Sequence, residues 1–142
     1  KDEIRQGYFG PKGERIRSYN NTRFEKTLKK KVKSTDFSTS TEETTPLPEK
    51  EFETLWQRCT RTLSKTRYYI PLQDGMTAEL DLFHGKLEGI ALVEVEFKTR
   101  VEAENFVPPS WFGRNVTQET WSINYELIGY TFKELKALMV ER

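Results

Sequence analysis

Apolar and polar residues alternate along most of the chain, which is the pattern of strands that bury one face. Residues 93–97 show it clearly, with Val or Phe at the odd positions and Glu between them. Most breaks between the alternating segments contain Gly, Pro or Asn, which are the residues that turns require. These signals together predict strands at about residues 4–9, 14–19, 23–31, 39–45, 64–71, 77–83, 89–98 and 120–128.

Three segments have the period of an amphipathic helix instead. Their apolar stripes are Phe52, Leu55, Trp56, Cys59 and Leu63 within 48–64, Ala103 and Phe106 after Thr99, and Phe132, Leu135, Leu138 and Met139 after Thr131. The second and third segments begin with the Thr-x-x-Glu pattern of a capping box. Because strands dominate, the sequence predicts an α+β fold, namely an antiparallel sheet or barrel with about three helices packed outside, as one domain over residues 1–142.

Like charges occur in pairs at alternate positions of five predicted strands, and alternate positions share a face. The pairs are Arg15 with Arg17, Lys29 with Lys31, Lys65 with Arg67, Glu79 with Asp81, and Glu94 with Glu96. One interpretation is an ordinary half-buried sheet whose charged face lies in water. However, neighbouring like charges repel each other, and a sheet exposed to water would gain from mixed signs.

The other interpretation is a closed barrel with its charges inside and its apolar faces packed outward against the helices. Separate basic and acidic walls suit a polyanion bound beside metal ions, because Lys and Arg replace the water around phosphate oxygens. Carboxylates hold Mg²⁺ or Mn²⁺, which bridges to the phosphates. One Cys and one His cannot build a zinc cluster, so any metal here is expected to be held by carboxylates and water.

The charge of the chain is unevenly distributed, although its formal sum is only +1. Residues 1–35 hold eleven Lys or Arg and four Asp or Glu, so the remaining residues are net acidic. No run approaches the ~20 apolar residues of a membrane helix, and the first residues lack the apolar stretch of a signal peptide. The single cysteine suits a reducing compartment. The sequence therefore predicts a cytoplasmic protein without a membrane partner, and the near-neutral charge makes nucleic acid an unlikely partner despite the lysines at 29–31.

Several short motifs follow one another in a fixed order. They are residues 6–9 (QGYF), 14–17 (ERIR), 27–29 (TLK), 63–68 (LSKTRY), 79–89 (ELDLFHGKLEG), 93–97 (VEVEF), 109–113 (PSWFG), 116–117 (VT) and Asn124. Their order and spacing resemble the CYTH, or triphosphate tunnel, superfamily, which includes class IV adenylate cyclases, thiamine triphosphatases and inorganic triphosphatases. The resemblance implies an antiparallel β-barrel, the triphosphate tunnel, which binds a triphosphate or nucleotide together with Mg²⁺ or Mn²⁺.

By position, the resemblance also implies roles for the paired charges. The implied substrate-binding residues are Arg15, Arg17, Lys29, Lys65 and Arg67, and the implied metal ligands are Glu79, Asp81, Glu94 and Glu96. Glu94 and Glu96 are also the implied catalytic residues, because a carboxylate can orient the attacking water. Glu42 and Glu43 are the two candidates for an acid in the family's fourth strand.

The chain departs from the family pattern in two places. The family's first strand carries Glu-x-Glu-x-Lys, and no such motif precedes Gln6, so the domain is expected to lack that strand and its metal-binding acids. A barrel without this strand would have an open edge, which a partner could cover, and a homodimer therefore stays open. In addition, Asn115 stands where the family has an acid before Val-Thr.

The pattern and the resemblance together favour metal-dependent hydrolysis of inorganic triphosphate or of a triphosphate-containing metabolite. The first alternative is a noncatalytic nucleotide or polyphosphate binder on the same fold, which the missing acids favour. The second is cyclisation of ATP, as in class IV adenylate cyclases, because the sequence has no base-reading motif that decides between these reactions. An ordinary sheet protein with exposed charge pairs is the remaining alternative.

Overall fold

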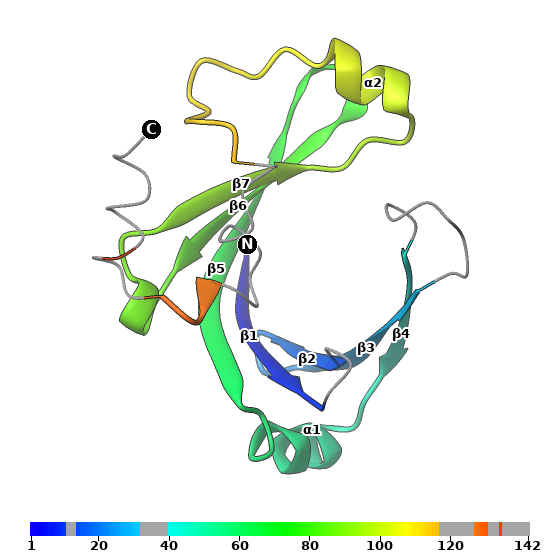
Figure 1. Cartoon of the computed structure of the whole chain (residues 1–142), viewed down its shortest axis with the longest axis vertical. Helices are drawn as coiled ribbons and strands as arrows, with labels where there is room; N and C mark the ends of the chain where they lie inside the picture. Colours follow the sequence, from blue (N-terminus) through cyan, green and yellow to red (C-terminus); the bar gives the residue numbers. More distant parts are fainter. Residues whose placement is uncertain (11–13, 32–39, 117–126, 131–133, 135–142) are drawn as a thin grey trace. The chain divides into compact units, whose positions relative to one another are not determined.

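The computed structural model describes residues 1–10, 14–31, 40–116, 127–130 and 134 (Figure 1). The chain forms two compact units, and each is described by itself. The N-terminal unit is Asp2–Lys65, and the C-terminal unit consists of Lys1 and the chain from Thr66 onward. The strands are hydrogen-bonded in the order β4-β3-β2-β1-β5-β6-β7.

Strands are the commonest element of the described chain, as the alternation predicts, and there are seven of them. They are β1 (Asp2–Phe9), β2 (Glu14–Tyr19), β3 (Arg23–Lys31), β4 (Ser40–Pro46), β5 (Arg61–Pro71), β6 (Thr77–Phe83) and β7 (Ala91–Val95). The connections include the helices α1 (Glu49–Trp56) and α2 (Arg100–Asn105) and the 3₁₀ turns Gln73–Gly75 and Gly85–Leu87. The strand pairs with a described register are antiparallel, which confirms the predicted class of sheet.

The prediction of a closed or nearly closed barrel is not confirmed. β4 and β7 are the ends of the strand order, and no pairing joins them within the described residues, so the sheet is open. Closure needs hydrogen bonds between the two edges or through a further strand, and the strand predicted at 120–128 lies almost wholly outside the described residues. The third predicted helix, at 131–139, also lies outside them, so the described part contains two α-helices rather than about three.

β2 and β3 of the N-terminal unit are joined by a turn with two asparagines at its centre. Asn20 and Asn21 have φ values of 56° and 55°, a left-handed conformation that Asn tolerates better than most residues. The N–H of Thr22 donates to the carbonyl of Tyr19 at 3.0 Å and closes the turn. The turn thereby fixes the β2–β3 register, and the register decides which side chains share a face.

Helix α1 covers the apolar face of the N-terminal unit (Figure 1). Phe52 of α1 packs against Ile16 of β2 and Phe24 of β3, and none of these three side chains is more than 6% exposed. The core explains the predicted stripe, because Leu55 and Trp56 pack against the same cluster. Helix α1 thus buries the apolar side of the sheet in this unit. The charged side chains of β2 project from the opposite side.

The first helix is shorter than predicted. It ends at Trp56 instead of residue 64, and Leu63 lies in β5. The reason is that the chain rejoins the sheet, where the N–H of Thr60 donates to the carbonyl of Tyr8 at 3.0 Å. Cys59, in the turn after the helix, still packs on the core, and its burial raises the pKa of the thiol to about 11.

Gly7 of β1 lies where the sheet backbone approaches this turn closely. A Cβ atom at Gly7 would be 2.6 Å from Sγ of Cys59 and 3.1 Å from the ring of Trp56. We therefore expect Gly7→Ala to lower the free energy of unfolding by about 1–3 kcal/mol, which thermal denaturation would measure. Gly113→Ala is the matched control, because no described atom lies within 4 Å of the position that its Cβ would take. Equal melting temperatures for the two variants would contradict the expectation.

The C-terminal unit contains the antiparallel pair β6–β7. Glu79 lies opposite Glu94 and Leu80 opposite Val93, so the acids occupy one face and the aliphatic residues the other. β7 ends at Val95, earlier than the predicted residue 98, because the chain turns there into α2.

The capping box predicted for α2 forms. The N–H of Glu102 donates to Oγ1 of Thr99 at 3.1 Å. In return, Oε2 of Glu102 accepts from the N–H of Lys98 at 3.0 Å, one residue before the N-cap rather than at the N-cap itself. Both bonds hold the backbone firmly at the point where β7 gives way to the helix.

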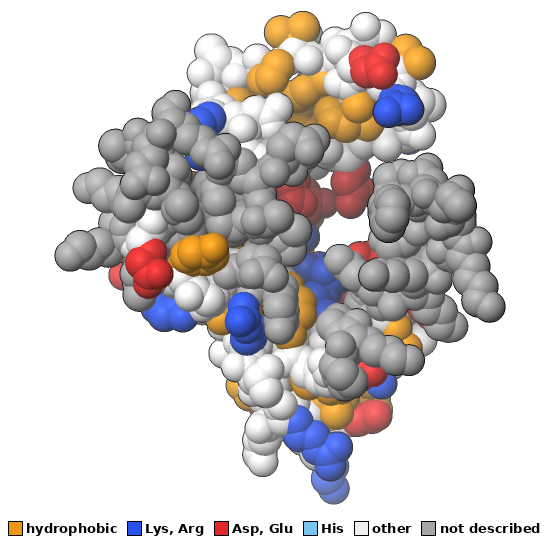
Figure 2. Space-filling view, in the orientation of Figure 1, with side chains coloured by type: hydrophobic (Ala, Val, Ile, Leu, Met, Phe, Trp, Pro, Cys, Tyr) orange, Lys and Arg blue, Asp and Glu red, His pale blue; other side chains and the backbone are white. Residues whose placement is uncertain are grey.

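Hydrophobic side chains lie at the surface around α2 (Figure 2). Val101 is 63% exposed, Val107 83% and Trp111 48%. Within the described residues, no helix has the length and apolar character needed to cross a membrane.

Candidate functional site

The polar face of the N-terminal unit is built by the register of its first three strands. Tyr8 of β1 lies opposite Arg15 of β2, and Arg15 lies opposite Thr27 of β3. Directly opposite residues project to the same side of an antiparallel pair. The face therefore combines the predicted cations of β2 with uncharged polar and aromatic neighbours from β1 and β3.

Arg17 is held in a buried network on this face. Its Nε donates to Oε1 of Gln6 at 2.8 Å, and its Nη1 donates to the hydroxyl of Tyr19 at 3.0 Å. Tyr19 in turn donates to Glu25 at 3.0 Å. Arg17 is only 8% exposed, and no described residue accepts a hydrogen bond from its Nη2. The guanidinium is thus fixed by two of its nitrogens, and no described residue bonds the third.

Arg15, two residues earlier, is less fully bonded. Its Nη2 donates to Oγ1 of Thr27 at 3.4 Å, while its buried Nε has no hydrogen-bond partner among the described residues. Burial and then the charge of Arg17 lower the pKa of Arg15, which still stays protonated at any physiological pH. Burial raises the pKa of the neighbouring Tyr8 phenol, against the opposing effect of the Arg15 charge. The face therefore carries two close cations whose repulsion an anion would relieve.

The two predicted lysines lie on strands of the same unit. Lys29 of β3 is opposite Glu42 of β4 in the register, and Glu42 is exposed. Lys65 of β5 is fully buried, at 0% exposure. A lysine so deeply buried requires polar or charged partners, because desolvation of its ammonium is costly.

Arg67 and Asp81 of the C-terminal unit form a buried, two-bond ion pair. Nε of Arg67 donates to Oδ1 of Asp81 at 2.8 Å, and Nη2 donates to Oδ2 at 3.0 Å. Nη1 contacts Oε2 of Glu79 at 2.8 Å. Burial alone would lower the pKa of Arg67, but the hydrogen bond and charge of Asp81, followed by the charge of Glu79, outweigh burial and raise it. All three nitrogens of this guanidinium are therefore used by carboxylates.

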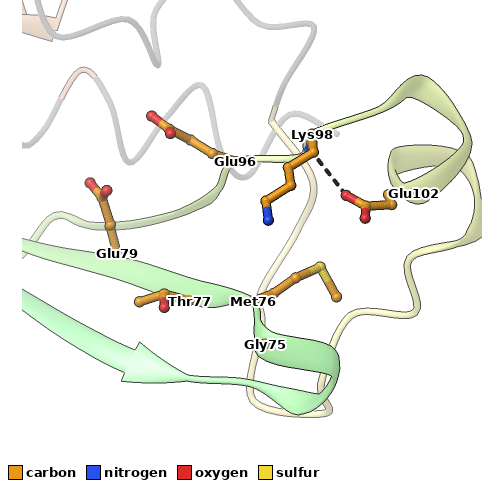
Figure 3. Close-up of a pocket in the computed structure, with 7 residues that line it drawn as sticks. All are labelled: Gly75, Met76, Thr77, Glu79, Glu96, Lys98 and Glu102. Atoms are coloured by element: carbon orange, nitrogen blue, oxygen red, sulfur yellow. Dashed lines mark hydrogen bonds between the residues drawn. The ribbon is translucent and has the colours of Figure 1, made fainter.

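Glu79 of β6 and Glu96, just after β7, border a pocket of about 190 Å³. Its lining includes Glu79 and Thr77 from β6, Glu96 and Lys98 from the chain after β7, and Glu102 of α2 (Figure 3). Glu79 and Glu94 lie directly opposite each other in the β6–β7 register, where like charges are unfavourable. Glu79 is compensated by its ion pair with Arg67.

The chemistry of these donors fits a divalent ion of the Mg²⁺ type. Mg²⁺ binds oxygen ligands and typically takes one or two carboxylates together with substrate phosphates and water. Glu79 and Glu96 supply two such carboxylates to one pocket. In the described part of the chain, no group of three or more Asp, Glu, His or Cys side chains is placed to bind one metal ion.

Sequence reasoning missed four polar residues of these sites. Gln6, Tyr8 and Tyr19 support the arginines of β2, and Lys98 lines the acidic pocket. The signal was the same alternation that revealed the charge pairs. Tyr19 is two residues after Arg17 and Lys98 is two residues after Glu96, so each continues a face already identified. Gln6 and Tyr8 alternate with each other on a strand that carries no charge pair.

The sheet with its cations, and the acidic pocket beside a lysine, are typical of a protein that binds phosphate groups. No model of a known protein family matches the chain. An inorganic triphosphatase of Nitrosomonas europaea is 47% identical to it over 70 residues, which is 49% of this chain and 46% of the relative. An inorganic triphosphatase of Acetivibrio thermocellus is 34% identical over 74 residues, which is 52% of this chain and 46% of the relative. These matches span about half the length of the curated relatives.

Solved structures extend the similarity to most of the chain. The crystal structure of the inorganic triphosphatase NE1496 has a TM-score of 0.66 and 36% identity, and the match covers 89% of this chain and 84% of that one. A crystal structure described as the hypothetical protein NE1496 gives a TM-score of 0.67 and 36% identity, with coverage of 92% and 86%. The chain therefore belongs to the same family as the inorganic triphosphatase NE1496.

Proposed function

We propose that this protein hydrolyses inorganic triphosphate, or a metabolite that contains triphosphate, with the help of Mg²⁺ or Mn²⁺. The observation that carries the proposal is the kinship with inorganic triphosphatases, at 47% identity over 70 residues and at 36% identity over most of a solved structure. The segregation of basic and acidic side chains on the strands supports it, because the substrate is a polyanion and its metal ion a cation.

In this proposal the cations bind the chain of phosphates. Arg15, Arg17, Lys29, Lys65 and Arg67 are the proposed substrate-binding residues. Arg17 supports this role best, since its Nη2 is left for a ligand while its other nitrogens are bonded. Arg67 would bind phosphate only after giving up a bond to Asp81 or Glu79. Cations so placed would also stabilise the charge that grows on the leaving phosphate.

The acids hold the metal and the attacking water. Glu79, Glu94, Glu96 and Asp81 are the proposed metal ligands, although Arg67 must first release Asp81. Mg²⁺ or Mn²⁺ held by these carboxylates would supply Lewis-acid chemistry to phosphate oxygens and to water. Glu94 and Glu96 are the proposed catalytic residues, which would orient that water toward the phosphorus. A tunnel that presents both sets of charges to one substrate belongs to the same proposal.

The test is phosphate release from inorganic triphosphate and from ATP, with Mg²⁺ and then with Mn²⁺. We expect metal-dependent release from the wild-type protein, loss of release in Glu94→Gln because the metal and water lose a ligand, and normal release in the control Glu88→Gln. Glu88 is an exposed acid that does not line the pocket.

The other outcomes would reassign the function. Absence of release, together with a melting temperature that triphosphate raises, would indicate a noncatalytic binder. Cyclic AMP formed from ATP would indicate a cyclase. Absence of both release and stabilisation would contradict the proposal and favour an ordinary sheet protein.

A further inference from the structure

Lys98 projects into the acidic pocket from a fixed point of the backbone. Its N–H donates to Glu102, and Glu102 is bonded to Thr99, so the capping box of α2 anchors the residue. The side chain itself extends along the pocket that Glu79 and Glu96 line (Figure 3). This cation is separate from the five proposed substrate-binding cations.

Lys98 makes no ion pair in the described part of the chain. No described carboxylate lies within 4.0 Å of its ammonium, although Glu79 and Glu96 line the same pocket. Glu96 likewise makes no ion pair in the described part of the chain. A pocket built for a metal ion alone would gain nothing from a cation, because like charges compete for the carboxylates. A pocket that must also accept an anion would gain from it.

The pocket is small. Its volume of about 190 Å³ is below the ~300–1,000 Å³ of sites that enclose drug-sized ligands. It therefore suits a phosphoryl group with its metal ion better than a nucleoside. The chemistry of the lining agrees, since its described residues offer carboxylates and an ammonium but no aromatic ring on which a base could stack.

We propose that Lys98 is a substrate-contacting residue that determines specificity. Its ammonium binds an oxygen of the terminal phosphoryl group. Glu79, once released by Arg67, and Glu96 would hold the metal ion in the same pocket. The pocket thereby selects substrates that end in a free phosphoryl group. This inference rests on the proposed triphosphatase function and adds a residue that the charge pairs did not include.

The test compares Lys98→Ala with Lys98→Arg and with the control Lys50→Ala, which removes an exposed lysine of α1. We expect Lys98→Ala to raise the KM for inorganic triphosphate about 10-fold, the effect of one charge-assisted hydrogen bond, with a smaller change in kcat. Lys98→Arg should restore most of the affinity, and Lys50→Ala should behave as the wild type.

A second measurement uses Mn²⁺ alone, titrated calorimetrically without substrate. Loss of the lysine charge should make Mn²⁺ bind several-fold more tightly in Lys98→Ala, opposite in sign to the effect on triphosphate. A purely structural role would weaken both ligands or neither. An unchanged affinity for triphosphate, or weaker binding of Mn²⁺, would overturn the inference.

Calorimetric titration with inorganic triphosphate separates this inference from the proposed function. If the wild-type protein hydrolyses nothing, the hydrolase proposal fails. Lys98→Ala must still bind triphosphate about 10-fold more weakly than the wild type for the role of Lys98 to stand. Equal binding by the two proteins would overturn that role whether or not hydrolysis occurs.

Discussion

Asp81→Ala should lower the free energy of unfolding by about 3–5 kcal/mol, which is the usual cost of leaving one charge of a buried pair without its partner. Arg67 and Asp81 have side chains only 9% and 3% exposed, and they share two hydrogen bonds. Glu79 would remain as a partner of Arg67, so the lower end of this range is the more reasonable expectation. Chemical denaturation monitored by tryptophan fluorescence would measure the effect.

A surface ion pair provides the matched control. Arg100 and Glu104 of α2 are 93% and 67% exposed, with 3.7 Å between Nε and Oε1, so Glu104→Ala should cost less than about 1 kcal/mol. The double variant Arg67→Met with Asp81→Leu should recover much of the lost stability, because it removes both buried charges. If Asp81→Ala is no more destabilising than Glu104→Ala, the buried pair does not stabilise the fold.

Arg17→Lys should weaken the binding of inorganic triphosphate by roughly 10–100-fold, which corresponds to one lost charge-assisted hydrogen bond. Lysine keeps the charge but not the planar fork with which Arg17 bonds Gln6 and Tyr19. The single ammonium of a lysine lacks the separate, fixed third nitrogen that Arg17 could offer to a phosphate in our proposal. Calorimetric titration with triphosphate would measure the loss.

Arg58→Lys is the control for this change, since Arg58 is exposed after α1 and the hydrogen bond described for it is made by its backbone. The melting temperature of each variant without ligand shows whether the fold is intact. A folded Arg17→Lys protein that binds triphosphate as tightly as the wild type would show that Arg17 does not contact the substrate.

Most strands could be predicted from the sequence because apolar and polar residues alternate between segments rich in turn residues. The Asn20-Asn21 turn between β2 and β3 is an example, as both residues adopt positive φ. The length of α1 could not be predicted in this way. Cys59 and Leu63 continue the helical period, but the hydrogen bond from Thr60 to Tyr8 makes that segment part of the sheet. The end of α1 is therefore set by pairing with a distant strand, and the local hydrophobic period gives no information about that pairing.

The candidate site could likewise be predicted from the sequence only in part. Alternation identified the charge pairs, and the described register puts Arg15 with Arg17, and Glu79 with Glu94, on common faces. The ion pair between Arg67 and Asp81 could not be foreseen, because it joins residues assigned to opposite roles. Which carboxylate approaches which guanidinium depends on the twist and spacing of β5 and β6. The alternation of residues predicts the face of each side chain, but it does not predict the twist or spacing of paired strands.

The boundary between the two compact units falls inside strand β5. Lys65 is the last residue of the N-terminal unit, and Arg67 is the second strand residue of the C-terminal unit. Because both residues belong to one strand, the strand rise alone sets their Cα atoms about 7 Å apart. Fragments expressed separately on the two sides of this boundary would divide one pair of proposed phosphate ligands between them. Protein engineers who seek a split version of this enzyme family should therefore cut elsewhere, in the connections that carry none of these cations.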